Sequence, residues 1–299
     1  MSADRGWKKD ALDRTAVLVL VVLCASWGLQ QVTVKFANRG VSPIWQSGIR
    51  SVGATFLLIA WMLARREPML RKDGTLWYGI AAGLLFSAEF LLIFLGLDYT
   101  NASRAVVFLY LAPFFIAMGA HWFLPGERLR AAQVAGLCCA FVGVLAVFHE
   151  SLGLPTRRIL IGDGMLAAAA LLWAATTVLI KATPLAAIAP GKVLLYQMAV
   201  SAVVLPLASA AAGEPGVVRL TPLVLACLAY QTVWIAFATY LAWFWLVRHY
   251  PASRLAAFTF LTPLFGVIAG GTLLREPLTG TLLLALALVG TGIYLVNRW

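Results

Sequence analysis

Long apolar stretches separated by short polar ones run through almost the whole chain. Crossing about 30 Å of hydrocarbon takes about 20 residues of helix, and stretches of about that length recur from residue 15 to residue 297. The pattern therefore predicts ten membrane-spanning helices. They are expected at 15–36, 43–64, 76–97, 102–123, 130–148, 160–181, 190–212, 221–247, 252–273 and 279–297.

Composition points to the same class of protein. Of the 299 residues, 62% are hydrophobic and 12% are charged, which is about half the charged share of a soluble globular domain. We therefore expect an all-α integral membrane protein without a soluble domain. Residues 1–14 are charged, and the apolar run after them is too long for a signal peptide, so 1–14 is interpreted as a cytoplasmic N-terminal segment before a retained first helix.

The formal net charge of +11 could suggest nucleic-acid binding, but the positive residues are spread over the connections between spans. With the N-terminus placed in the cytoplasm, 15 of the 23 Lys and Arg residues fall on cytoplasmic segments and 7 on external ones, with Arg50 inside the second span. This asymmetry favours cytoplasmic termini. The charge therefore predicts orientation in a bacterial inner membrane, with lipid contacts and no nucleic-acid partner.

The two halves of the chain resemble each other. ASRAVVFLYLAPFF at 102–115 matches ASRLAAFTFLTPLF at 252–265 at seven of fourteen positions, and WGLQQVTVK at 27–35 aligns with WAATTVLIK at 173–181. Each half, 15–148 and 160–297, holds five predicted spans, so the second enters the membrane from the opposite side. Inverted repeats are typical of carriers that alternate between two open states; a duplication that only enlarged a membrane scaffold is the alternative.

These motifs, with the acidic residues Glu127 in PGERL and Glu276 in LREPL, resemble the drug/metabolite transporter superfamily of the EamA type over the whole chain. The aromatic residues and the intramembrane Glu89 are similar to the YddG-like branch of aromatic amino-acid exporters. The resemblance implies ten helices in two inverted repeats and export of amino acids, aromatic ones included. Export of drugs or other metabolites stays open as an alternative.

Arg50 and Glu89 are the ionisable residues expected deepest in the membrane, each about 10 Å from the external face. Such residues are costly in hydrocarbon unless they are paired or face water. One interpretation is a structural ion pair between the second and third spans. The other is a substrate-facing or proton-linked Glu89 that contacts the ammonium group of an amino acid.

Polar and aromatic residues on other spans complete the candidate substrate site. Trp27, Gln31 and Lys35 lie on one helical face, and Trp173, Thr177 and Lys181 lie in matching places. Both lysines are interpreted as interfacial anchors. The resemblance implies a central path lined by Trp27, Tyr110, Trp173, Gln231, Trp234 and Phe260. For Gln231 an interhelical hydrogen bond is the alternative.

Motifs of other functions are weak. HExxH, GxSxG, CxxC and a phosphate-binding loop do not occur in the sequence, so an enzyme embedded in the membrane is the less favoured alternative. The four cysteines fall within apolar spans, so neither a disulfide nor a metal site is expected, and no cofactor is predicted. The GDG at 162–164 is interpreted as an entry turn, and Pro113, Pro206 and Pro263 as sites of helix bending. A monomer or weak homodimer is expected.

Overall fold

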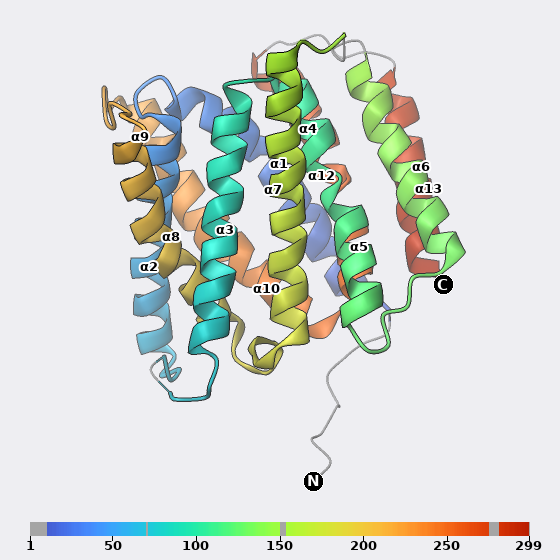
Figure 1. Ribbon diagram of the computed structural model, residues 1–299, viewed down its shortest axis with the longest axis horizontal. Helices are drawn as coiled ribbons and strands as arrows, with labels where there is room; N and C mark the ends of the chain where they lie inside the picture. Colours follow the sequence, from blue (N-terminus) through green and yellow to red (C-terminus); the bar gives the residue numbers. More distant parts are fainter. Residues whose placement is uncertain (1–10, 70, 150–153, 275–280, 299) are drawn as a thin grey trace.

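The computed structural model describes residues 11–69, 71–149, 154–274 and 281–298, and its helices lie side by side with roughly parallel axes (Figure 1). Within these residues ten helical segments are long and apolar enough to cross a membrane. They coincide with the predicted spans to within a few residues. The first repeat contains α1 (Arg14–Ala37), α2 (Pro43–Ala64), α3 (Leu76–Leu97), α4 (Ala102–Leu109), α5 (Ala112–Phe123) and α6 (Ala131–Phe148).

The second repeat begins with α7 (Arg157–Ala182), which starts three residues before its predicted span. The helix begins early because the Thr156 side chain accepts a hydrogen bond from the Ile159 amide and so caps it. The remaining elements are η2 (Pro184–Ala187), α8 (Pro190–Ala211), α9 (Pro222–Ala229), η3 (Tyr230–Thr239), α10 (Tyr240–His249), α11 (Ala252–Phe258), α12 (Leu261–Leu274) and α13 (Thr281–Arg298).

The two repeats interlock. Helix α3 packs against α7 and α8, α2 packs against α8 and η3, and α1 packs against α12 and α9. Helices α6 and α13 pair at one edge of the bundle (Figure 1). There a Cβ atom added to Gly292 would lie 2.7 Å from the Ala140 Cβ, so the small residue permits this close packing.

Two spans are broken at equivalent places. The fourth changes from α4 to α5 at Tyr110 and Leu111, and the ninth changes from α11 to α12 at Thr259 and Phe260. A proline follows each break within a few residues, at Pro113 and Pro263, and proline lacks the amide that would continue the helical hydrogen bonds. By contrast, Pro206 lies inside the uninterrupted helix α8.

The eighth span contains a π-helix, η3, between α9 and α10. The apolar pattern predicted an ordinary α-helix there. Wider turns of this kind expose backbone groups and often mark functional positions. Here the π-helix ends at Thr239, which lies among the central aromatic residues described below.

A buried lysine ties α8 to the α2–α3 connection. The Lys192 ammonium donates to Asp73 Oδ2 at 2.7 Å and to the Arg71 carbonyl at 2.9 Å. The hydrogen bond from Lys192, followed by the one from the Thr75 hydroxyl, holds the pKa of Asp73 well below its usual range. The ionised carboxylate is therefore favoured by folding.

This pair predicts a pH dependence of stability. Because the folded pKa of Asp73 is depressed, its contribution is complete above its unfolded pKa of about 3.9 and is lost as the pH falls through the folded value. Asp73→Asn is expected to lower the melting temperature at pH 7 and to shrink the loss of stability below about pH 4. Melting curves in detergent from pH 7 to pH 2 measure this, and parallel profiles for the two proteins would contradict it.

Candidate functional site

Aromatic side chains from three helices meet in the interior and are here called the aromatic cluster: Trp27, Phe86, Phe90, Tyr240 and Trp243. The Trp27 ring stands edge-on to Tyr240 and Trp243, with centroids 6.2 and 5.4 Å away. Phe86 contacts Phe90 and Tyr240. The indole nitrogen of Trp27 donates to Thr239 Oγ1 at 2.9 Å, which orients the ring.

Arg50 on α2 reaches this cluster. Its guanidinium carbon lies 4.4 Å from the centroid of the Phe90 ring and 6.0 Å from that of Tyr240. The residue is only 2% exposed, and its Nε and Nη2 atoms are buried without a hydrogen-bond partner among the described residues. Aromatic faces partly compensate a buried cation, but they leave its N–H groups unpaired.

Glu89, which precedes Phe90 on α3, lies at the same level and is 7% exposed. The next residue, Phe90, contacts the Arg50 guanidinium. However, the ion pairs found within the described part of the chain join other residues, so the direct Arg50–Glu89 pair considered from the sequence is not formed. The Arg50 guanidinium instead lies against the rings of Phe90 and Tyr240.

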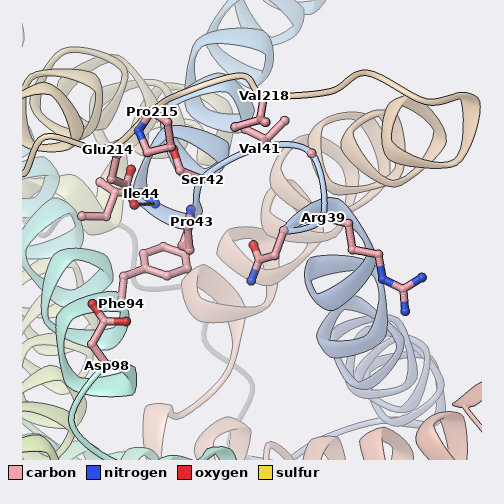
Figure 2. Close-up of a pocket in the computed structure, with 12 residues that line it drawn as sticks. Arg39, Val41, Ser42, Pro43, Ile44, Phe94, Asp98, Glu214, Pro215 and Val218 are labelled. Carbon is pink, nitrogen blue, oxygen red and sulfur yellow. Dashed lines mark hydrogen bonds between the residues drawn. The ribbon is translucent and has the colours of Figure 1, made fainter.

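A cavity of about 480 Å³ opens above this level, at the end of the bundle opposite to Arg14 and Arg298. We call it the vestibule. Phe94 faces Pro43 across it, whereas the Arg39 guanidinium points away (Figure 2). The lining comes from the α1–α2 turn, the end of α3 and the α8–α9 connection: Asn38, Arg39, Gly40, Val41, Ser42, Pro43, Ile44, Phe94, Asp98, Glu214, Pro215 and Val218.

Two helical faces lead from the vestibule to the charged residues. On α3, Phe94 lies one turn from Phe90, which contacts Arg50. On α2, Gln46 lies one turn from Arg50 and donates to Asn38 Oδ1 of the vestibule at 2.8 Å. Arg50 is about 10 Å from the start of α2. Along α2 the vestibule thus lies about two helical turns from Arg50 and the aromatic cluster.

The vestibule wall is braced by Glu214. Its carboxylate accepts a hydrogen bond from the Ile44 amide at 3.1 Å (Figure 2). It also accepts from the Trp45 amide at the start of α2, at 2.9 Å, and from the Ser209 hydroxyl. A carboxylate at a helix N-terminus satisfies amides that lack a partner within the helix. This acidic residue therefore has a structural role.

A polar network, here called the terminal latch, closes the end where α1 begins and α13 ends. The Lys181 ammonium pairs with Glu127 Oε1 at 2.9 Å and donates to the Val247 and Tyr250 carbonyls. Glu127 Oε2 accepts from the Ala252 amide at 2.7 Å, at the start of α11. Lys181 is 8% exposed. It is therefore a buried ion-pair partner and not the interfacial anchor expected from the sequence.

Tyr250 extends the latch to the first helix. Its hydroxyl donates to Asp13 Oδ2 at 3.0 Å, and Asp13 also caps α1. The terminal latch therefore joins the start of α1, the α5–α6 connection, the end of α7 and the α10–α11 turn. Glu276, the counterpart of Glu127 in the second repeat, lies outside the described residues.

A second buried ion pair holds α4 to α7 near the opposite end. Arg104 Nε lies 3.1 and 3.0 Å from the two carboxylate oxygens of Asp163, and Nη2 also donates to Oδ2. The Thr100 hydroxyl adds a bond of 3.0 Å. The GDG at 162–164, expected to form an entry turn, is instead part of helix α7. From there Asp163 reaches Arg104 on α4.

The structure brings together only part of the predicted substrate site. Trp27 joins the aromatic cluster beside Glu89, whereas Tyr110 and Phe260 pack in a separate group with Phe114 and Phe141. Tyr110 and Phe260 are 6% and 0% exposed, so in this state they form part of the packed core.

Other predicted residues occupy different environments. Gln31 is exposed on α1, and Trp173 is half-buried on α7, where its carbonyl accepts from the Thr177 hydroxyl at 3.1 Å. Gln231 is buried, and its Nε2 has no partner within the described chain. Trp234 is exposed at the bundle surface and donates to Ser26 Oγ.

The sequence analysis missed Phe86, Phe90, Phe94, Thr239 and Tyr240. A signal for the first three was present, because they recur every four residues on α3 around Glu89, as one face of a helix does. No comparable signal marks Thr239 and Tyr240. Their approach to Trp27 depends on the π-helix and on packing between the two halves.

Comparison with known proteins shows which of them resemble this chain. The model of the EamA-like transporter family matches residues 14–149 and again 160–298. The uncharacterized transporter YvbV of Bacillus subtilis (strain 168) is 30% identical over 95% of this chain and 92% of its own. A probable amino-acid metabolite efflux pump of Escherichia coli (strain K12) is 27% identical over 94% and 92% of the two chains. A solved crystal structure has the same fold, with a TM-score of 0.82 at 21% identity, and the match covers 96% of this chain and 98% of that one.

Proposed function

Because the chain belongs to the EamA-like transporter family of the drug/metabolite transporter superfamily, we propose that it is a secondary transporter that exports amino acids, including aromatic ones. The observation that carries the proposal is the position of Arg50 and Glu89: two buried side chains of opposite charge, set among aromatic rings beneath the vestibule. Aromatic walls with a few polar groups suit a small ligand with an apolar body and a charged end.

The name of the E. coli relative, an amino-acid metabolite efflux pump, supports the direction and the class of substrate. The positive charges of the connections favour a bacterial inner membrane with both termini in the cytoplasm. In that orientation the vestibule faces outward and the terminal latch faces the cytoplasm. Transport would then require the latch to open while the vestibule closes, as inverted repeats allow.

Export of cationic drugs is the second candidate, because Glu89 beside aromatic rings is also suited to an organic cation. The two candidates differ in what Arg50 would do. A bare cation gains nothing from a buried guanidinium beside Glu89, whereas the carboxylate of an amino acid does. This difference favours amino acids.

The test is flux of labelled phenylalanine, leucine and alanine from liposomes containing the purified protein, with and without a pH gradient. We expect flux well above that of empty liposomes for at least one amino acid. Failure of all twenty amino acids together with flux of a cationic dye would replace this proposal by the drug candidate.

Glu89→Gln is expected to keep normal expression and melting temperature, because Glu89 forms no direct ion pair in the described structure. Amino-acid flux should fall by at least about tenfold, since one charged hydrogen bond to the substrate is lost. Asp73→Asn, which changes an acidic residue in the α2–α3 connection, is the control and should leave flux unchanged when measured well below its lowered melting temperature. Unaltered flux and an unaltered pH profile in Glu89→Gln would exclude a role for Glu89 in binding or proton linkage.

A further inference from the structure

We propose that Arg50 binds the carboxylate of the substrate whose ammonium group Glu89 binds, so that the two residues recognise a zwitterionic α-amino acid. This inference rests on the proposed function. It names Arg50 as the residue that would restrict the substrates to α-amino acids. The observation behind it is one edge of the Arg50 guanidinium, whose Nε and Nη2 atoms are buried and without partners among the described residues.

Leaving Nε and Nη2 of a buried arginine without acceptors is costly, because these N–H groups have lost water and gained no partner. In the other buried arginine pair of this protein, Arg104 uses the same Nε and Nη2 edge to bind both oxygens of Asp163. That edge is the one Arg50 leaves free. A guanidinium edge matches a carboxylate through two parallel hydrogen bonds, which an ammonium or hydroxyl ligand does not provide.

The surroundings of Arg50 favour a ligand with both charges. Glu89 directly precedes Phe90, whose ring centroid lies 4.4 Å from the Arg50 guanidinium carbon, and yet no direct ion pair joins Glu89 to Arg50 within the described chain. In an α-amino acid the ammonium and carboxylate groups are separated by one carbon atom. A molecule placed between the two residues would therefore satisfy both, with opposite charges in contact.

The aromatic rings restrict where the rest of the ligand lies. The rings of Phe90 and Tyr240 pack against the guanidinium, with their centroids 4.4 and 6.0 Å from its central carbon. Trp27 stands edge-on to Tyr240, and Phe86 contacts both Phe90 and Tyr240. An apolar side chain of the substrate would therefore contact ring faces and edges, and charged side chains would be disfavoured.

The test measures equilibrium binding of labelled phenylalanine to purified protein, with two competitors. Phenylalaninamide lacks the carboxylate, and N-acetylphenylalanine lacks the ammonium group. We expect the wild-type protein to bind phenylalanine with about 30-fold higher affinity than either competitor. A difference of this size corresponds to the loss of one charge-assisted hydrogen-bonding group. Arg50→Met should abolish the preference over phenylalaninamide only, and Glu89→Gln the preference over N-acetylphenylalanine only.

Stability separates a ligand role from a structural one. Because Nε and Nη2 of Arg50 have no hydrogen-bond partner within the described chain, Arg50→Met should keep or raise the melting temperature, whereas removing a structural partner would lower it. Arg50→Lys, which keeps the charge without the fork, should recover only part of the affinity for phenylalanine.

The outcomes also separate this inference from the proposed function. Equal losses of phenylalanine and phenylalaninamide binding in Arg50→Met, with wild-type flux intact, would overturn the inference and leave the transporter proposal standing. The expected binding preferences without flux in liposomes would support the inference and overturn the proposed function. If wild type binds none of the twenty amino acids, the inference is overturned.

Discussion

Replacing Asp163 by Asn is expected to lower the free energy of unfolding by about 3–5 kcal/mol, because it leaves the buried Arg104 guanidinium without its counter-ion. The two side chains are 9% and 3% exposed, and Asp163 also accepts from the Thr100 hydroxyl. Chemical unfolding in mixed micelles measures the change.

The matched control is Asp98→Asn. Asp98 lies at the same end of the bundle and is exposed, so this change should alter stability by less than about 0.5 kcal/mol. The double variant Arg104→Met/Asp163→Leu should recover much of the loss, since apolar residues can replace a buried ion pair at little cost. Equal effects of Asp163→Asn and Asp98→Asn would show that the Arg104–Asp163 pair does not stabilise the fold.

Replacing Lys181 by Met is expected to open the terminal latch. Without the ammonium, Glu127 is left as an unpaired carboxylate that is only 11% exposed, and its contact with the start of α11 weakens. Cys24 reports on this opening, because it is fully buried against α11, with its Sγ 3.3 Å from the Phe258 carbonyl oxygen. In a protein with Cys138, Cys139 and Cys227 replaced by Ala, labelling of Cys24 by a water-soluble maleimide should accelerate by at least about tenfold.

Lys192→Met is the matched control for this prediction. Lys192 is also a buried lysine with an acidic partner at the terminal end, but it joins α8 to the α2–α3 connection. Its loss should destabilise the protein without exposing Cys24. Unchanged labelling in Lys181→Met, or the same acceleration in both variants, would contradict a local role of the latch.

Hydrophobic length and the internal repeat were sufficient to predict ten membrane-spanning helices in two inverted halves. A membrane-spanning helix needs about 20 apolar residues whatever helices surround it, so each span can be predicted from its own stretch of sequence. The breaks before Pro113 and Pro263 were also foreseeable as bends, because proline acts on its own helix.

The partners of polar residues were less accessible from sequence. In the sequence, Lys181 near a helix end is typical of an interfacial anchor, but the fold places Glu127 of the α5–α6 connection beside it. Likewise, Asp163 within GDG is typical of a turn, but the fold places Arg104 of α4 beside it. These contacts join residues 54 and 59 positions apart, across helices whose packing order no local pattern reveals. Arg50 and Glu89 were found because charge deep in an apolar span is conspicuous, but the missing direct contact between them depended on the rings around them.

The vestibule, the charged pair beneath it and the latch on the other side together describe a carrier with one end closed. We expect amino acids to cross at a site that is exposed to one side of the membrane at a time. Counterflow tests this most directly: liposomes containing the protein are loaded with unlabelled phenylalanine and diluted into a trace of labelled phenylalanine. We expect transient accumulation of label inside the liposomes above its external concentration, and less accumulation with Glu89→Gln and Arg50→Met. Label that only equilibrates, at a rate independent of internal phenylalanine, would contradict it.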